Sequence, residues 1–428
     1  MTRDEVFQYL SLAEKNKSSQ SLFIMEQLLL ELGSPEQKVP AVHLAGTNGK
    51  GSTARLLESC LREAGYKTGL YTSPHVLCFS ERIRVNGENI SDHELSSLTQ
   101  KVQSAEAKLG LRLNYFQIVT ALAFLHFAKS NCDIAVLETG LGGRLDPTNV
   151  LKAPLVSIIT AIGLDHIELL GSSLGLIARE KAGIIKPCCD TVLLKQNAQV
   201  EAVIRDVCAK QNSRLFIAEK PKAEIEGLGL KLCTDLGSFE LGLNGSYQAE
   251  NAALALCAIS RLNEKGFCIP KEAIKKGLKN AAWAGRFERV CLKPLMLIDG
   301  AHNPQAALAL KESLSAYFPD KRAVFLMAAM QDKDYIGCIK AVAPLAKAMV
   351  AVGLNYSRAV CANTLRAAMA QVCKNSYAAS GVKEALLLAK GLNAELIVGF
   401  GSLYLAAPFR EEARTLCEQS IKEESACI

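Results

Sequence analysis

The segment Gly46–Thr53, which reads GTNGKGST, encloses a lysine between glycines. An apolar run, Val39–Ala45, precedes it, and a segment with helical periodicity at 54–64 follows it. Glycines at a strand-to-helix junction let backbone N–H groups turn toward a polyphosphate, and the first turn of a helix adds partial positive charge. Lys50 would contact the outer phosphates, and a hydroxyl after it would lie near the cation. The candidate phosphate-binding residues are Gly46, Thr47, Asn48, Gly49, Lys50, Gly51, Ser52 and Thr53.

This spelling differs from the standard P-loop, which has four residues between its first glycine and the Gly-Lys pair. Here only two residues separate Gly46 from Gly49, and Gly51 separates Lys50 from Ser52. The alternative interpretation is a glycine-rich turn that binds no ligand. A lysine enclosed by glycines at such a junction has little structural purpose, which favours phosphate binding.

A second candidate group is the carboxylate of Glu138, which ends the apolar run at 134–137. The carboxyl ends of strands in an open α/β sheet face the ligand crevice. A carboxylate there is costly unless it is paired or bound to a metal, and oxygen donors suit Mg²⁺. The alternative is an exposed glutamate at a strand end, which is less consistent with the glycines at 140–143.

Both groups need strands to position them, and several short runs rich in Val, Ile and Leu precede helical patterns. Such alternation indicates a parallel sheet in an α/β domain. The expected strands of this series are Val39–Ala45, Thr68–Thr72, Asp133–Leu137, Leu155–Thr160 and Thr191–Leu194. Residues 222–243 alternate more loosely and predict an antiparallel addition, and residues 251–262 predict a helix.

The pattern breaks near residues 282–288, and a second α/β series follows it. Its expected strands are Leu295–Ile298, Ala323–Met327, Ala348–Val352 and Glu395–Val398. We therefore expect an N-terminal P-loop-type ATPase domain at 1–287, with a mainly parallel sheet, and a smaller Rossmann-like α/β domain at 288–428. The tail after Arg410 predicts an amphipathic helix.

Composition narrows the classes of partner. The chain has 428 residues, 49% of them hydrophobic, and a net charge of +6 that no Lys/Arg run concentrates. This balance suits an anionic small molecule and argues against nucleic acid, which usually leaves a basic stripe. We find no signal-peptide pattern, and no window approaches the roughly 18 uninterrupted apolar residues of a membrane helix. We expect a cytoplasmic protein that binds no membrane.

The fifteen cysteines are odd in number and include no Cys-x-x-Cys pair. Most lie within apolar patterns, where a free thiol behaves as a small hydrophobe. We expect them to be reduced packing residues, and the missing ligand pairs argue against zinc.

The loop GTNGKGS resembles that of the Mur ligase superfamily, and within it the folylpolyglutamate synthase and dihydrofolate synthase family. Further motifs occur in the family's order from residue 43 to residue 404. They are Tyr71–His75, Glu81–Gly87, Glu138–Asn149, Asp165–His166, Ala178–Gly183, Gly285–Glu288, Asp299–Pro304, Asp332–Asp334 and Gly401–Tyr404. Chance explains one such match but not the series.

The resemblance implies an ATP-dependent ligase. The family transfers a phosphoryl group from ATP to a carboxylate, and the amine of L-glutamate attacks the resulting acyl phosphate. A site of this kind must neutralise a triphosphate, a carboxylate and a tetrahedral intermediate, so it needs metal and cations more than a protein nucleophile. ATP and two Mg²⁺ ions are the cofactors that the resemblance implies.

The metal ligands that the resemblance implies are Ser73 and Glu138 on one ion and His166 on a second. Without the family, His166 would be a capping or packed residue. Lys181 would be a solvated helix lysine, but the matching lysine of the superfamily is carbamylated, which converts it into an anion for the second Mg²⁺.

Other residues of the motifs imply nucleotide contacts. Asn251 resembles the asparagine that contacts adenine, although a helix-start amide explains it nearly as well. Arg286, at the presumed hinge, would reach ATP phosphates. Asp299 would bind the ribose hydroxyls and His302 would lie near the phosphates. Closure of the two domains would exclude water from the acyl phosphate.

Substrate contacts are expected at Phe116, Arg144, Asp332 and Lys333. Helix packing is the alternative for Phe116, and a charged turn is an equal alternative for the Asp-Lys pair, which in the family lies near the incoming glutamate. Related enzymes commonly carry Glu where Gln117 stands, which leaves substrate choice open.

The implied substrates are dihydropteroate, which would receive its first glutamate, and reduced folates, which would receive further glutamates. Polyglutamylation alone is an alternative, as is a cell-wall precursor ligase, although only about 40 residues precede the phosphate loop and a separate sugar-binding domain needs more. A P-loop ATP-binding regulator is the non-enzyme alternative. A monomer is expected, as is common in the family.

Overall fold

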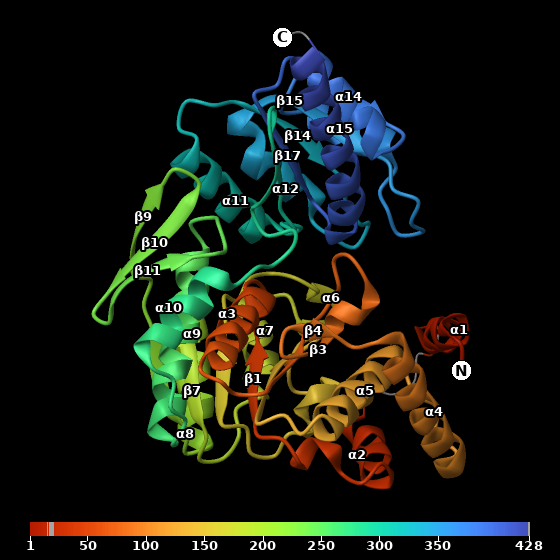
Figure 1. The fold of residues 1–428 in the computed structure, drawn as a ribbon, viewed down its shortest axis with the longest axis vertical. Helices are drawn as coiled ribbons and strands as arrows, with labels where there is room; N and C mark the ends of the chain where they lie inside the picture. The colour runs from red at the N-terminus through yellow and green to blue at the C-terminus, as the bar shows by residue number, and fades with distance from the viewer. Residues whose placement is uncertain (15, 17–20, 427–428) are drawn as a thin grey trace.

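The computed structural model describes residues 1–14, 16 and 21–426, which form two α/β bodies, one above the other in Figure 1. The first body holds an eight-stranded sheet with strand order β4-β3-β2-β5-β1-β6-β7-β8. Six neighbouring strands of this order, β2, β5, β1, β6, β7 and β8, are parallel to one another. Strands β3 and β4 form an antiparallel hairpin at the β2 edge. The strands are β1 (Ala41–Ala45), β2 (Thr68–Tyr71), β3 (Ile83–Val85), β4 (Glu88–Asn89), β5 (Ile134–Glu138), β6 (Val156–Ile159), β7 (Asp190–Leu194) and β8 (Arg214–Ala218).

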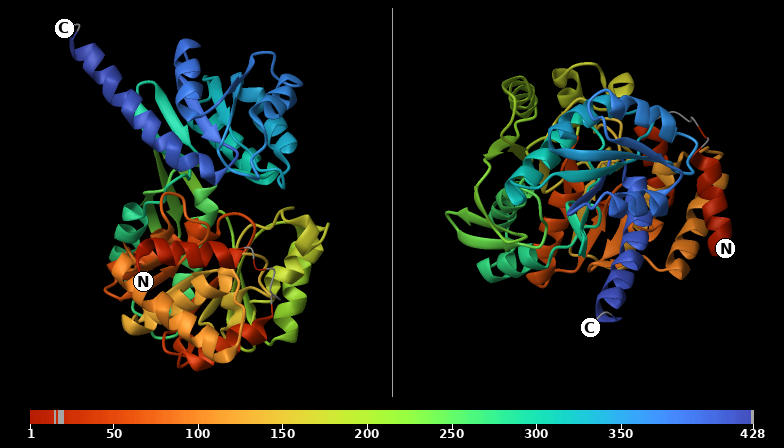
Figure 2. Two further views of the ribbon diagram at one scale, coloured as in Figure 1. Left: turned by 90° about the vertical axis from the view of Figure 1, so that its right-hand side faces the viewer. Right: turned by 90° about the horizontal axis from the view of Figure 1, so that it is seen from above.

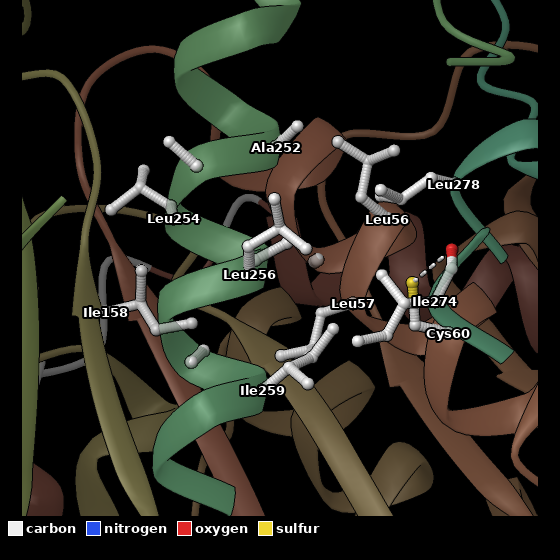
Figure 3. Packing of buried hydrophobic residues seen from close by; sticks show 14 of the residues in the cluster. Leu56, Leu57, Cys60, Ile158, Ala252, Leu254, Leu256, Ile259, Ile274 and Leu278 are labelled. Atoms are coloured by element: carbon white, nitrogen blue, oxygen red, sulfur yellow. Dashed lines mark hydrogen bonds between the residues drawn. The ribbon is translucent and has the colours of Figure 1, made fainter. Parts of the chain in front are cut away.

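The parallel strands are apolar on both faces because helices cover both faces. On one face, α3 (Lys50–Glu63) and α9 (Gln248–Glu264) pack on the sheet, and α10 (Lys271–Asn280) packs on α3. Figure 3 shows this core, where Leu56 and Leu57 of α3 meet leucines of α9. Full burial of each leucine contributes about 1.5–3 kcal/mol. A Cβ on Gly277 of α10 would lie 2.5 Å from the Cα of Cys60, so glycine permits this close helix contact.

Five further helices cover the opposite face and the far edge of the sheet. Four of them build one core with β2 and β5, and α7 builds a second with β6, β7 and α8 (Ala198–Lys210). These helices are α1 (Arg3–Glu14), α2 (Leu22–Glu31), α4 (Asp92–Leu109), α5 (Tyr115–Lys129) and α7 (Leu174–Ala182). A one-turn helix, α6 (Ile167–Leu170), precedes α7.

The expected antiparallel addition is confirmed. Strands β9 (Lys222–Glu226), β10 (Gly229–Thr234) and β11 (Gly237–Leu241) form a three-stranded antiparallel sheet, which projects to one side in Figure 1. Buried and exposed residues alternate along β11, as a sheet with one solvated face requires.

The second body holds a six-stranded sheet of order β12-β13-β17-β14-β15-β16, in which only β12 is antiparallel. Its strands are β12 (Glu288–Leu292), β13 (Leu295–Ile298), β14 (Ala323–Met327), β15 (Ala346–Val352), β16 (Ser376–Ala379) and β17 (Leu396–Phe400). Its helices are α11 (Pro304–Tyr317), α12 (Tyr335–Val342), α13 (Ala362–Ala370), α14 (Val382–Gly391) and α15 (Ala406–Ala426). They build one core on each face of the sheet. The expected fold class, a mainly parallel N-terminal sheet followed by a smaller α/β sheet, is confirmed (Figure 2).

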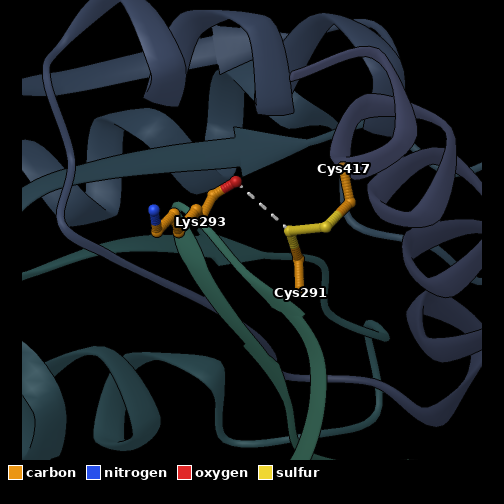
Figure 4. Close-up of a disulfide and its surroundings, with 3 residues drawn as sticks. All are labelled: Cys291, Lys293 and Cys417. Atoms are coloured by element: carbon orange, nitrogen blue, oxygen red, sulfur yellow. Dashed lines mark hydrogen bonds between the residues drawn. A yellow bond between two sulfur atoms is a disulfide. The ribbon is translucent and has the colours of Figure 1, made fainter. Parts of the chain in front are cut away.

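One sequence expectation is wrong: the cysteines are not all reduced. Cys291 of β12 and Cys417 of α15 form a disulfide (Figure 4). They lie 126 residues apart, so no local spacing in the sequence predicts this pair. The packing of α15 against β12 brings the two cysteines together. The other cysteines of the described chain are free, and Cys427 lies outside the described residues.

None of the helices in the described part of the chain combines the length and apolar composition that a membrane span needs.

Candidate active site

A cleft separates the carboxyl ends of the parallel strands of the first body from the second body. The loops after β1, β2, β5 and β6 line the cleft on the side of the first body, and the loops after β13 and β17 line it on the side of the second body. The cleft collects most of the candidate residues. Its walls include Gly46–Ser52, Ser73, Glu138, His166, Lys181, Asn251, Arg286, Asp299 and His302.

The phosphate loop is shaped by contacts that require glycine. Gly49 has φ +90° and precedes the first turn of α3, and a Cβ there would lie 2.2 Å from Oδ1 of Asn251. A Cβ on Gly46 would lie 1.8 Å from Oγ1 of Thr160. Asn251, the expected adenine contact, thus packs under the loop, where its amide donates to Gln248 at 2.8 Å. The bare start of α3 faces the cleft, as an anion site requires.

Lys50 lies between the loop and the carboxylate of β5. Its Nζ donates to the carbonyls of Gly46 at 3.0 Å and Thr47 at 3.4 Å, and it lies 3.8 Å from Oε1 of Glu138. The ammonium group is thus held in the cleft by weak partners, which a polyphosphate would replace with stronger charge-assisted hydrogen bonds.

Glu138 is buried at the end of β5. Its Oε2 accepts a hydrogen bond of 3.2 Å from the backbone N–H of Ser73, which follows β2. Burial raises the pKa of Glu138, and the nearby charge of Lys50 opposes this shift. A buried carboxylate beside a hydroxyl and a phosphate loop is an oxygen donor set that fits Mg²⁺.

Lys181 is buried on α7, and its Nζ donates a hydrogen bond of 2.7 Å to the carbonyl of Gly46. Burial, reinforced by the charge of Lys50, lowers the pKa of Lys181 to about 7. The solvated helix position that the bare sequence favours is therefore wrong. An amine with this pKa is largely neutral at slightly alkaline pH, as reaction with carbon dioxide requires.

A polar cluster crosses the cleft around Asp165. Lys333 from the second body donates to Oδ1 of Asp165 at 2.6 Å and lies 3.1 Å from Nε2 of His166. His302 lies 3.7 Å from Oδ2 of Asp165, and Asn303 donates to the same oxygen at 3.4 Å. Burial raises the pKa of Asp165, but the neighbouring His302 and Lys333 outweigh it and hold this pKa well below its usual range. His166 thus faces a lysine.

The hinge carries Arg286 and Asp299. Asp299 Oδ2 accepts hydrogen bonds from the Tyr247 hydroxyl at 2.5 Å and the Phe287 N–H at 2.8 Å, and Phe287 has φ +45°. A Cβ on Gly300 would lie 1.9 Å from Nη1 of Arg286, so this glycine makes room for the guanidinium beside the cleft. Asp299 therefore fixes the junction between the two bodies through Tyr247 and Phe287. This structural role comes in addition to the ribose contact that the family resemblance implies.

Five expected residues lie outside the cleft wall. Thr53 is fully buried on α3, which leaves Ser52 as the hydroxyl that lines the cleft. Arg144 does not line the cleft and pairs with Glu180 at 3.0 Å. The remaining three are Phe116, whose ring packs at Gly140, Lys333, which contacts the wall through Asp165, and the exposed Asp332.

The sequence predicts Asn48 as a phosphate-binding residue, but it predicts neither the contacts of Asn48 across the cleft nor a role for Asn303, Gln305 or Trp283. Asn48 and Asn303 exchange hydrogen bonds of 3.2 and 3.0 Å between the two bodies, and Asn48 also donates to Gln305 at 2.8 Å. Trp283, the single tryptophan, lies against the phosphate loop: a Cβ on Gly51 would lie 3.2 Å from its Nε1. The tryptophan was visible as a rare residue beside the hinge, whereas the amide pairs carry no signal in the sequence.

In the described part of the chain, no three His, Cys, Asp or Glu side chains converge as a ready metal cluster. A site for Mg²⁺ here therefore has to draw on hydroxyls, on the nucleotide phosphates or on a modified lysine.

Both bodies match known domains. Residues 44–259 match the Mur ligase middle domain, and residues 285–403 match the Mur ligase glutamate ligase domain. The fold and the phosphate-loop cleft thus define a Mur ligase.

The Bacillus subtilis dihydrofolate synthase/folylpolyglutamate synthase is 36% identical over 409 residues, which span 91% of this chain and 94% of the relative. The chain belongs to the folylpolyglutamate synthase and dihydrofolate synthase family, and is a ligase. The Escherichia coli enzyme of the same name is 33% identical over 304 residues, 69% of this chain and 68% of that one.

Solved structures agree with this family. A Mycobacterium tuberculosis folylpolyglutamate synthase complexed with ADP has a TM-score of 0.88 at 29% identity, over 97% of this chain and 98% of that one. FolC of E. coli, in complex with DHPP and ADP, has a TM-score of 0.83 at 28% identity, over 98% of each chain.

Proposed function

We propose that this protein uses ATP to join L-glutamate to the carboxylate of a folate-type acceptor and so forms an amide bond. The observation that carries the proposal is that Lys50, Glu138 and Lys181 lie in one cleft at the carboxyl ends of the parallel strands. The family to which the chain belongs couples glutamate to folates. Lys50 and a cation held by Glu138 would neutralise phosphate charge, and no covalent bond to the protein is needed because the acceptor carboxylate itself attacks ATP.

In the first step, an oxygen of the acceptor carboxylate attacks the γ-phosphorus of ATP, and ADP leaves. Backbone N–H groups at the start of α3 and the Lys50 ammonium would hold the β- and γ-phosphates. Arg286, which lines the cleft from the hinge, would neutralise charge as the bond to ADP breaks. The product is an acyl phosphate.

The oxygen donors of Glu138 and Ser73 would hold one Mg²⁺, which supplies charge neutralisation of the phosphates when bound. We propose that His166 and a carbamylated Lys181 would hold a second. Burial and the lowered pKa of Lys181 support the carbamate, because they favour the neutral amine that carbon dioxide modifies.

In the second step, the amine of glutamate attacks the acyl carbon, a C–N bond forms and phosphate leaves with the shared oxygen. His302 and Lys333 lie on the second body beside Asp165, where they would orient the anionic intermediate and the incoming amino acid. The amide pairs of Asn48 with Asn303 and Gln305 would hold the bodies closed and exclude water from the acyl phosphate.

We further propose that the acceptors are both dihydropteroate and tetrahydrofolate, with Phe116 and Arg144 toward the acceptor and Asp332 toward glutamate. The similarity to the dihydrofolate synthase/folylpolyglutamate synthases of B. subtilis and E. coli supports this bifunctional assignment over polyglutamylation alone. We also propose a division of the chain into domains at 1–287 and 288–428, since β12 starts the second sheet at Glu288. A cytoplasmic monomer is proposed.

ADP release tests the function when it is crossed against acceptors. ATP, Mg²⁺ and L-glutamate should release ADP only with dihydropteroate or tetrahydrofolate, and mass spectrometry should show the acceptor gaining one glutamate. Turnover with tetrahydrofolate alone would limit the activity to polyglutamylation. Turnover with a UDP-linked wall precursor, or ADP release without glutamate and acceptor, would contradict the proposal.

A further inference from the structure

Two tyrosines of the second body form an exposed aromatic surface. The rings of Tyr356 and Tyr404 stack at 4.4 Å with an interplanar angle of 29°, and their hydroxyls lie 3.3 Å apart. They remain 39% and 40% exposed. The guanidinium of Arg358 lies 5.9 Å from the centre of the Tyr356 ring. A stacked pair left open to solvent offers a flat surface on which another planar ring can stack.

This surface lies next to the active-site cleft. Leu403, the neighbour of Tyr404, lines the cleft. The segment that carries Tyr356 and Arg358 is tied to the loop before Lys333, because the N–H of Gln331 donates to the carbonyl of Arg358 at 2.9 Å. Lys333 in turn contacts Asp165 across the cleft. The aromatic surface and the reaction site therefore lie on the same side of the second body.

The first body presents a matching surface. The guanidinium of Arg82 lies 5.4 Å from the centre of the Tyr115 ring. Burial and the hydrogen bond with Tyr356 raise the pKa of Tyr404 to about 12, while the charge of Arg82 acts in the opposite direction. Burial raises the pKa of Tyr115, the charge of Arg82 opposes this shift, and Glu14 and Tyr356 add to it. These electrostatic effects indicate that the two surfaces lie near each other.

Positive charge on both surfaces is poorly compensated. Arg82 is 6% exposed, its Nε donates to Nδ1 of His75 at 2.9 Å, and its Nη1 is buried without a hydrogen-bond partner. Arg358 meets Asp332 at 3.9 Å, with both side chains about half exposed, and an exposed pair of that length contributes little. Aromatic rings beside a weakly paired, half-exposed guanidinium such as that of Arg358 fit a ligand that is both planar and anionic.

We propose that Arg358, beside the Tyr356 ring, binds the α-carboxylate of a glutamate that the acceptor already carries. This inference rests on the proposed function. An acceptor without glutamate has one carboxylate, which is consumed in the reaction, whereas each attached glutamate adds an α-carboxylate that is not. Arg358 is thus a specificity-determining residue that separates glutamylated from unglutamylated acceptors.

The test compares acceptors in wild type and Arg358→Gln. With dihydropteroate, kcat/KM should stay within about twofold of wild type. With mono- and diglutamyl tetrahydrofolate, it should fall at least about tenfold, mainly through KM, and high salt should shrink the difference because it screens the pair. Arg366→Gln, an exposed change on α13 of the same body, is the matched control and should leave both ratios unchanged.

An equal loss on all acceptors would show a structural effect of Arg358, and no loss on any acceptor would show that it does not contact the tail; either result overturns the inference. Both results leave the proposed function intact, since wild type still ligates glutamate. Failure of wild type on every acceptor would instead contradict the function itself. Circular dichroism and thermal unfolding of each variant identify any loss that comes from misfolding.

Discussion

Lys181 Nζ donates a 2.7 Å hydrogen bond to the carbonyl oxygen of Gly46, although the two residues lie 135 positions apart. This contact ties α7 to the phosphate loop and places an amine of lowered pKa next to the phosphates. A lysine on the solvated face of a helix would do neither. The relationship supports the proposal that Lys181 acts in the reaction, whether or not it is carbamylated.

Replacement of this lysine should stop the reaction. Lys181→Ala removes a charged group that acts on the phosphates, so kcat should fall by about 100-fold or more. Small carboxylates such as formate or acetate should restore part of the rate if the functional form is a carbamate. Lys210→Ala, an exposed change on α8, serves as control. A rate for Lys181→Ala near that of wild type would exclude Lys181 from the site.

The carboxylate at the end of β5 should govern the response to magnesium. Glu138→Gln keeps the shape of the side chain but removes the charge that would bind the ion, so the Mg²⁺ concentration for half-maximal rate should rise at least about tenfold and kcat should fall with it. Titration of Mg²⁺ at saturating ATP measures both changes. A wild-type rate at low Mg²⁺ would show that Glu138 is no metal ligand.

The strands that position these groups were predictable for a physical reason. Strands β1 and β5 are buried on both faces, so unbroken apolar runs mark them in the sequence. The β3–β4 hairpin was not recognised because strands of two or three residues are too short to show a period. In β16, the mixed composition of residues 376–379 hides a short strand at the sheet edge.

The residues of the candidate site also differ in whether the sequence predicts them. The glycine-rich loop and Glu138 were readable because each is a local pattern at the end of a strand. The burial of Lys181 and the meeting of Asp165 with Lys333 depend on tertiary packing over more than a hundred residues, and local sequence does not encode it visibly. The family resemblance predicts a functional role for Lys181, but it assigns no role to Asp165.

A buried histidine should make the fold sensitive to acid. His43 on β1 contacts the hydroxyl of Thr148 at 2.7 Å, and burial lowers its pKa to about 3, with Lys186 adding to the shift. The unfolded chain therefore binds one more proton between about pH 3 and pH 6.5, so stability contributed by this group falls as pH falls through that window. Each pH unit costs about 1.4 kcal/mol within it.

His43→Gln should remove this dependence while its amide keeps a partner for Thr148. Urea unfolding between pH 4.5 and pH 7 measures the free energy of unfolding, and its slope against pH should be smaller in the variant by about one proton. An unchanged slope would show that His43 titrates normally in the folded protein.

The disulfide between Cys291 and Cys417 should stabilise the second body. Cys417→Ser should lower its free energy of unfolding by about 2–4 kcal/mol in protein prepared without reductant. Alkylation in denaturant before and after reduction, followed by mass spectrometry, should show two protected thiols in wild type. If both cysteines are alkylated without reductant, the bond does not form in solution and the variant should unfold like wild type.

The position of bound nucleotide tests the central claim most directly. A crystal structure with Mg²⁺ and a non-hydrolysable ATP analogue should place the γ-phosphate between Lys50 and Glu138, with the β-phosphate on the backbone N–H groups that open α3. A triphosphate bound anywhere else would contradict the account.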